Sequence, residues 1–291
     1  MKKILITALL FILAGSVTGY AKKKAEHPRA EIMVSYNYHE VHLKTDAKAY
    51  VAEIPMVLLT NGMDSKFYNL RHEYFDSLHS TPSGHKLWRE MMSAAAKKAV
   101  ETGNFDDVPA APIQLYVFKS TNDSVLTVFD SNGSSGSHYY TEPFGTMHWH
   151  LGDSTKTILG YECFLAETDF HGRHWRAWFA PDIPLHDGPW KLCGLPGLIL
   201  EAAEDSGQHI FTACGIEKSR AEILPVYRKK EYEKAKRIDV LKAQRKYLLK
   251  GDVMSMMLIQ NTPDGSKVDM PEPSHNENPD LHVDFLETDY H

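Results

Sequence analysis

The sequence predicts an α+β protein that is mainly antiparallel β. From residue 113 to residue 216, short apolar segments follow one another, and turns containing Gly, Asp, Pro or Ser separate them. Such a succession is typical of an antiparallel meander. Two other segments predict a helical insertion near 65–102 and a charged helix at 226–250. With a hydrophobic content of 43%, the pattern predicts a single β-rich domain over residues 22–291.

The first 21 residues predict a cleavable secretory signal. Two lysines precede the apolar run 4–14, and small residues at 19 and 21 suit a cleavage site before Lys22. The apolar run is shorter than the ~20 residues needed to cross a bilayer. We therefore expect an exported protein of the periplasm or cell envelope, without a transmembrane span.

The individual elements follow from local spacing. Residues 31–60 predict two strands, the second interrupted by Pro55 at an edge or a bulge. The segment 65–102 has apolar residues at helical spacing in two pieces, which Thr81-Pro82-Ser83-Gly84 separates. Residues 281–285 predict one last edge strand.

Charge is distributed unevenly near the C-terminus. The segment 226–250 has ten Lys or Arg against three acidic residues, whereas 252–291 has nine acidic residues and one Lys. Either the helix is solvated and its charges pair with those of the irregular acidic tail, or it presents a basic face to an anionic membrane surface. The net charge of −6 argues against a general nucleic-acid binder.

Residues 178–200 are the most distinctive segment. Pro181 and Pro184 stop regular pairing after large apolar side chains, and Gly194 and Gly197 flank Leu195-Pro196. Glycine permits backbone angles that other residues avoid, and proline fixes its own. The segment therefore predicts a rigid apolar loop leading into a strand at 198–203.

The run Gly194-Leu195-Pro196-Gly197-Leu198-Ile199 resembles the signature of the GLPGLI family, exported proteins of Bacteroidetes without an established function. Gly160-Tyr161-Glu162-Cys163 and the block 177–190 are also similar to that family, and the resemblance is specific over about 156–217. It implies a cell-envelope location and a β-rich fold. By analogy of fold, it implies an open curved sheet like the half-barrel of periplasmic lipoprotein carriers, which does not itself establish function.

A metal site is the leading chemical hypothesis. His148 and His150 alternate, so both imidazoles are expected on one face of a strand, and Met147 precedes them. Such ligands suit copper or zinc. His39 with His42, and His171 with His174, are further candidates if the chain bends between them. The alternative is that these are surface histidines.

Four aromatic residues support a different interpretation. Trp175, Trp178, Phe179 and Trp190 either line an apolar cleft for a ligand or belong to the core. Zinc-protease, nucleophile-elbow and phosphate-loop motifs are absent from the sequence, and no catalytic residue is predicted. We therefore expect a non-enzymatic binding or carrier protein for an apolar ligand or an envelope partner protein. A periplasmic metal-binding protein is the alternative, and an envelope hydrolase is the third interpretation.

The three cysteines allow one disulfide and leave one thiol over. Cys163 and Cys193 are the expected pair. Cys214 lies in a predicted strand and is expected to be a small buried hydrophobic residue.

Overall fold

The computed structural model describes residues 27–44, 49–104, 108–109, 113–131, 136–249, 282–283 and 285–290. The predicted signal at 1–21 and most of the acidic tail lie outside this part of the chain. Within it, no helix combines the length and the apolar character needed to cross a membrane.

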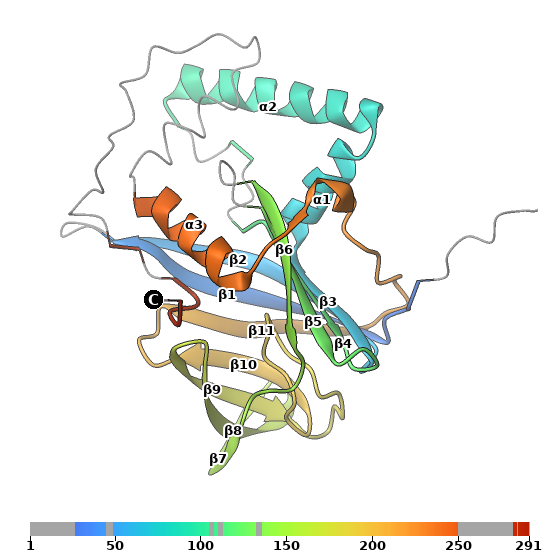
Figure 1. The fold of residues 1–291 in the computed structure, drawn as a ribbon, viewed down its shortest axis with the longest axis vertical. Helices are drawn as coiled ribbons and strands as arrows, with labels where there is room; N and C mark the ends of the chain where they lie inside the picture. The colour runs from blue at the N-terminus through green and yellow to red at the C-terminus, as the bar shows by residue number, and fades with distance from the viewer. Residues whose placement is uncertain are drawn as a thin grey trace, which may run out of the picture.

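One open sheet of 13 strands dominates the described residues, and two consecutive antiparallel meanders build it (Figure 1). The first meander contains β1 (Ile32–Lys44), β2 (Ala49–Thr60), β3 (Asp64–Asn69), β4 (Leu115–Ser120), β5 (Val125–Ser131) and β6 (Ser137–Pro143). The second contains β7 (His150–Ile158), β8 (Tyr161–Phe170), β9 (Arg173–Ala180), β10 (Leu198–Glu204) and β11 (His209–Lys218). The meanders join where β1 pairs with β11, from Ile32↔Lys218 to Glu40↔His209. The short β13 (His282–Val283) pairs with β1, and β12 (Glu233–Lys234) runs parallel to β6.

The helical insertion lies between β3 and β4, and it is shorter than predicted. Residues 64–69 are the strand β3, so the first helix, α1 (Leu70–His79), begins only at residue 70. Asn69 caps it by accepting a hydrogen bond from the His72 backbone N–H at 2.8 Å. The second helix, α2 (Pro82–Thr102), starts behind the cap Thr81 and ends at Gly103, whose φ is +69°.

The predicted helix 226–250 also begins later than expected. The helix α3 (Arg237–Leu249) is preceded by the single 3-10 turn η2 (Lys229–Glu231) and by β12. Tyr232 and Val226 are buried in this irregular stretch, which covers part of the sheet. The predicted fold class is confirmed: a mainly antiparallel open sheet with a helical insertion and a charged C-terminal helix.

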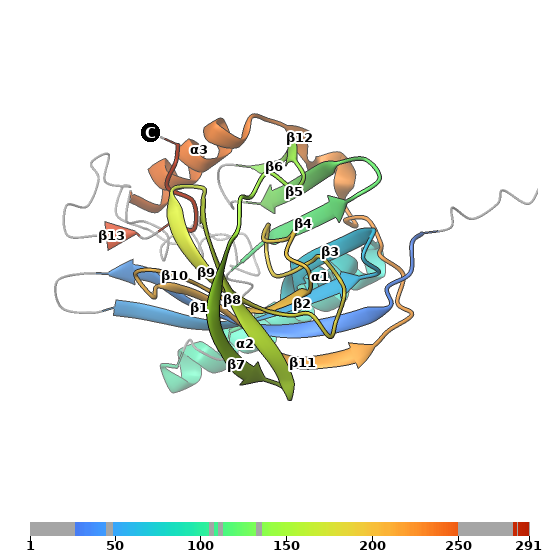
Figure 2. The same cartoon turned by 90° about the horizontal axis from the view of Figure 1, so that it is seen from below.

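Alternation along the strands of the first meander builds a core on each face of the sheet. In β2, Ile54, Met56 and Leu58 belong to the larger core, while Val57 and Leu59 belong to the smaller one. We call the face with the larger core the inner face. The sheet curves around it, and the loop between β9 and β10 (181–197) lies on it (Figure 2).

The loop 181–197 contains most of the motif that resembles the GLPGLI signature, and a buried lysine holds it against β4. Lys119 donates from Nζ to Asp187 Oδ1 and to the carbonyl of Gly188, both at 2.6 Å. Asp187 Oδ1 also accepts from the Gly188 N–H at 2.8 Å. At the end of the motif, the carbonyl of Ile199 accepts from the Tyr36 hydroxyl of β1 at 2.6 Å. These buried polar contacts join the loop to the middle of the sheet.

Gly197 is required because another chain segment passes close to it. A Cβ atom at this position would overlap the carbonyl group of Ala180 and lie 2.8 Å from Pro181 N. Gly194 serves a different purpose: its φ is +93°, an angle that L-residues rarely adopt. The two glycines of the motif thus meet two separate backbone constraints.

We predict that Gly197→Val lowers the free energy of unfolding by several kcal/mol, about 3 or more, since the overlap is with backbone rather than a movable side chain. Urea unfolding followed by circular dichroism measures the change. Gly215→Ala on β11 is the matched control, because its nearest contact would be Ser35 Cβ at 3.9 Å. Equal stability of the two variants would refute the packing role of Gly197.

Candidate functional site

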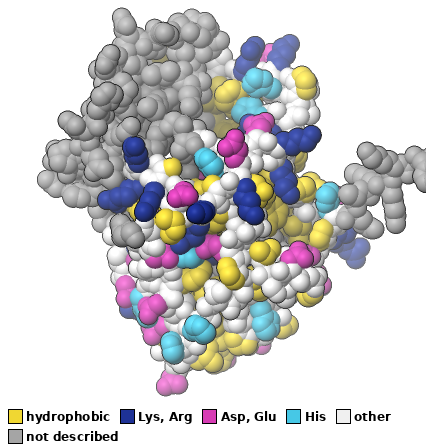
Figure 3. Space-filling view, viewed as in Figure 1, with side chains coloured by type: hydrophobic (Ala, Val, Ile, Leu, Met, Phe, Trp, Pro, Cys, Tyr) yellow, Lys and Arg dark blue, Asp and Glu magenta, His cyan; other side chains and the backbone are white. Residues whose placement is uncertain are grey.

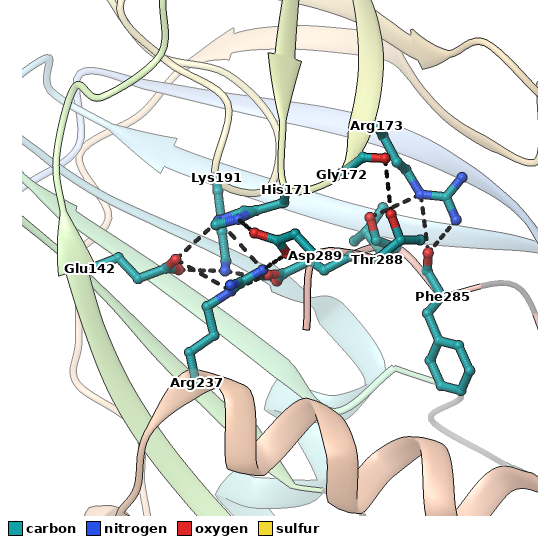
Figure 4. A network of polar contacts seen from close by, with 11 residues as sticks. Glu142, His171, Gly172, Arg173, Lys191, Arg237, Phe285, Thr288 and Asp289 are labelled. Atoms are coloured by element: carbon teal, nitrogen blue, oxygen red, sulfur yellow. Dashed lines mark hydrogen bonds and ion pairs between the residues drawn. The ribbon is translucent and has the colours of Figure 1, made fainter. Parts of the chain in front are cut away.

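A cluster of charged residues joins both flanks of the sheet across the inner face (Figure 4). Its centre is Lys191 of the loop 181–197, which is 0% exposed. Lys191 Nζ pairs with Glu142 of β6 and lies 2.7 Å from Glu287 Oε1. We call the following residues the cross-sheet cluster: Glu142, His171, Lys191, Arg237, Glu287 and Asp289.

The other two basic residues of the cluster face the remaining carboxylate oxygens. His171, in the turn between β8 and β9, places Nε2 3.0 Å from Glu142 Oε1 and Nδ1 3.2 Å from Asp289 Oδ2. Arg237, the first residue of α3, places Nε 2.5 Å from Glu287 Oε2 and also pairs with Asp289. The cluster therefore contains three carboxylates together with an ammonium, a guanidinium and an imidazole.

The segment 285–290 supplies two of these carboxylates, and backbone contacts fix its position. Arg173 Nε donates to the carbonyls of Phe285 and Leu286 at 3.0 and 3.1 Å. Thr288 Oγ1 donates to the carbonyl of Gly172 at 2.9 Å. The turn between β8 and β9 thus holds the segment in place, as the dashed contacts of Figure 4 show.

The cations strongly favour the ionised form of Glu142. Burial opposes ionisation, but the hydrogen bond and charge of His171 and the charge of Lys191 lower the pKa of this carboxyl to about 2. Asp130 of β5 differs, because burial raises its pKa to about 7 while Gln244 of α3 donates to its Oδ2 at 2.6 Å. Within the cluster, Glu142 is a fixed anion at neutral pH and a poor general acid.

A cavity of about 210 Å³ opens beside the cross-sheet cluster. Glu142, His171 and Lys191 contribute charged groups to its wall, and Met147 and Phe170 contribute apolar surface. His171, which lines this wall, has a φ of +52° and Gly172 a φ of +80°; these angles are normal for the two-residue turn that joins β8 to β9.

The cavity suits a small polar group better than a lipid. Its volume lies below the roughly 300–1,000 Å³ of pockets that enclose drug-sized ligands. Cys193 also lines it, but burial raises the pKa of this thiol to about 11, so it is a weak nucleophile at neutral pH. The wall offers hydrogen-bond donors, acceptors and apolar contacts, which is an arrangement for binding.

The four predicted ligand-binding aromatics occupy different places. Trp175, Phe179 and Trp190 are at most 3% exposed, and the rings of Trp175 and Trp190 lie 5.6 Å apart in the larger core. Trp178 is half-buried under Lys156, whose Nζ is 4.5 Å from its ring centre. Three of the four residues therefore fill the inner face of the sheet instead of lining an open cleft. Of the two interpretations, their burial supports the core.

The predicted metal ligands also separate. Met147 lines the cavity and packs against the core, whereas His148 and His150 are exposed. Between them, Trp149 is half-buried and donates to the carbonyl of Cys193 at 2.9 Å. Met147 thus differs from the two histidines in burial, and a metal site at Met147, His148 and His150 stays a prediction. Among the described residues, one group of three side chains has metal-ligand spacing: Glu142, His171 and Glu287.

The predicted Cys163–Cys193 disulfide is not formed, and all three cysteines are free. Cys163 lies on β8 near Lys156 and Glu201, while Cys193 lies in the loop near Lys119 and Asp187, so the two thiols have different neighbours. Cys214 is exposed rather than buried, since the larger core is on the other face of β11.

Sequence patterns did not single out Glu142, Lys191 or Glu287. They come from a strand, a loop and a distant segment, and no short motif links them. His171 was a candidate metal ligand together with His174, and it lies in the group with metal-ligand spacing. Lys191 also had a usable signal, because it lies inside the distinctive segment 178–200, between Trp190 and Leu192.

Comparison with known families finds similarity over part of the chain. Residues 106–244 match the family model described as "N-glycanase peptide, N-terminal domain". This match includes β4 to β11 and part of α3, somewhat less than half of the chain. No curated protein matches the chain.

Three solved structures are more distantly similar. PNGF-II in two crystal forms is 12% and 13% identical, with TM-scores of 0.48 and 0.45. Both alignments cover 74% of this chain and 33% of PNGF-II, so the chain spans about a third of that protein's length. A putative outer membrane lipoprotein-sorting protein domain from Vibrio parahaemolyticus is 8% identical, with a TM-score of 0.22, and covers 68% of this chain and 89% of the domain.

The cross-sheet cluster predicts an acid-sensitive fold. The pKa of Glu142 is lowered from 4.5 to about 2, so its stabilising effect is complete above pH 4.5 and is lost as the pH falls toward 2. The shift corresponds to roughly 3 kcal/mol. Urea unfolding at successive pH values is expected to show this loss in the wild type and a shallower slope in Glu142→Gln.

Glu162→Gln, at an exposed position of β8, is the control and is expected to follow the wild-type pH profile. Parallel profiles for the wild type and Glu142→Gln between pH 4.5 and pH 2 would contradict the proposed role of this carboxylate.

Proposed function

We propose that this protein is a non-catalytic binding module that recognises a sugar residue of an N-linked glycan through the cavity beside the cross-sheet cluster. The observation that carries the proposal is the composition of that wall. Glu142 offers acceptors, and His171 offers a donor or an acceptor, which is what the hydroxyl groups of a sugar require. Phe170 and Met147 offer the apolar surface against which the C–H face of a sugar ring packs.

The match to the N-terminal domain of N-glycanases supports the choice of ligand class. The filled inner face supports a small polar ligand over an apolar one, because Trp175 and Trp190 occupy the space that a carrier would leave open. The ion-paired carboxylates support binding over acid–base catalysis, since Glu142 and Glu287 already have cationic partners.

The exported location and the relation to the GLPGLI family remain part of this proposal. N-linked glycans are found on secreted and surface proteins. A protein directed out of the cytoplasm by residues 1–21 would therefore meet such a ligand.

Isothermal titration with a released N-linked oligosaccharide tests the function. We expect saturable binding to the wild type and at least tenfold weaker binding to Met147→Trp, because the larger side chain fills the cavity. Leu151→Trp on β7 is the control, since Leu151 is exposed and is not part of the cavity wall. Absence of binding to the wild type, or equal affinity of both variants, would overturn the proposal.

A second candidate function is metal binding by Glu142, His171 and Glu287. One ligand atom from each residue lies within 4.8 Å of the other two, which suits zinc or copper. Lys191 and Arg237 compete with it, because their charges already neutralise both carboxylates.

Elemental analysis of tag-free protein after dialysis against zinc or copper decides between the two candidates. If Lys191 and Arg237 already neutralise the carboxylates, we expect less than about 0.1 equivalent of bound metal per chain, because a metal ion would have to displace buried ion pairs. Stoichiometric metal that His171→Gln abolishes, while His148→Gln retains it, would instead establish the metal centre.

A further inference from the structure

Six lysines form a basic face on the segment that covers the edge of the sheet. All are exposed and lie between η2 and the end of α3: Lys229, Lys230, Lys234, Lys236, Lys242 and Lys246. In Figure 3, Lys and Arg side chains form a band across the middle of the molecule, over α3 and the stretch before it. The chain as a whole has a net charge of −6, so this density of positive charge is local.

Within the described residues, none of these six ammonium groups has an ion pair. The arginines of the same segment differ, because Arg228 pairs with Asp76 and Glu231, and Arg237 pairs with Glu287 and Asp289. The lysines on α2 differ as well: Lys86 and Lys97 each lie within 4.0 Å of a glutamate one turn away. The basic face is therefore distinct from an ordinary solvated face of compensated charges.

The geometry of α3 directs its lysines away from the protein. Val240 and Leu241 are buried against the sheet, and Lys242 and Lys246, one turn apart, are exposed on the other side. Over residues 237–246, whose side chains the structure describes, the apolar side of α3 is used in the core and offers no free apolar face to a bilayer. Contact through this face must be electrostatic and peripheral.

We propose that the basic face binds an anionic membrane surface through lipid phosphate groups. Lysine is a mobile point charge that suits a diffuse layer of headgroups, whereas recognition of a single phosphate favours the planar fork of arginine. Here Arg228 and Arg237 are committed to internal carboxylates and Arg245 lies over the ring of Phe285, so the exposed cations of this face are lysines. The α3 helix alone is about 20 Å long, which exceeds the size of one small anion.

The face is separate from the cavity beside the cross-sheet cluster, and its function does not depend on sugar binding. None of the six lysines lines that cavity. Membrane contact through them leaves the cavity wall unchanged.

Co-sedimentation with lipid vesicles tests the proposal. The full chain is expected to bind vesicles of phosphatidylcholine with about one third phosphatidylglycerol, and not phosphatidylcholine alone, since each lysine near an anionic surface adds attraction. Binding is expected to disappear in about 0.5 M salt, where the Debye length is only a few ångströms. The double variant Lys242→Gln/Lys246→Gln is expected to bind at least roughly tenfold more weakly.

The matched control is Lys86→Gln/Lys97→Gln, which removes the same charge from α2. We expect it to bind like the wild type. If both double variants bind vesicles equally weakly, binding depends on the net charge of the protein and not on the basic face, and the proposal is overturned. Binding to phosphatidylcholine alone, or to soluble polyphosphate in preference to anionic vesicles, would overturn it as well.

Discussion

The burial of the Lys191 ammonium constrains much of this structure. A charged amine that is 0% exposed requires anionic partners, and removing one partner of a buried pair typically costs about 3–5 kcal/mol. Glu142 comes from the first meander, and Glu287 comes from the segment 285–290. Since Lys191 belongs to the loop 181–197, one side chain ties three distant parts of the chain to the same point. Lys119 of β4 holds the same part of the loop in a similar way, through Asp187.

The strands could be predicted from the sequence to a greater extent than the helices or the site. Alternation and turn residues located the meanders, because the period-two pattern is local. Residues 65–69 were predicted as the start of a helix, because Phe67 and Leu70 also fit helical spacing, but pairing with both β2 and β4 makes them part of a strand. The charged stretch 226–236 has helical composition, yet it is irregular, with Val226 and Tyr232 buried. The cross-sheet cluster could not be predicted, because the pairs of Lys191 with Glu142 and Glu287 join segments that lie far apart in the sequence.

The filled inner face changes the functional interpretation. A curved antiparallel sheet suggests a carrier with an open apolar hollow, and Trp175, Trp178, Phe179 and Trp190 were the candidates to line it. In the structure, the rings of Trp175, Phe179 and Trp190 fill the inner face together with the loop 181–197. A small cavity with charged walls lies at the margin of this core. In the described part of the chain, the sheet is thus curved, and the protein's own side chains fill its inner face.

The central position of β1 has a consequence for how the chain folds. Strand β1 can pair early with β2, because the two strands are neighbours in the sequence. Its other edge stays unpaired until β11, which lies far along the sequence, has formed. Until then, each meander has an exposed edge, and such long-range pairing makes folding slow. A secreted chain would gain from this delay, because it would reach its compact state only after most of it had emerged. The same delay makes the unpaired edge of β1 a site where two unfinished chains can associate.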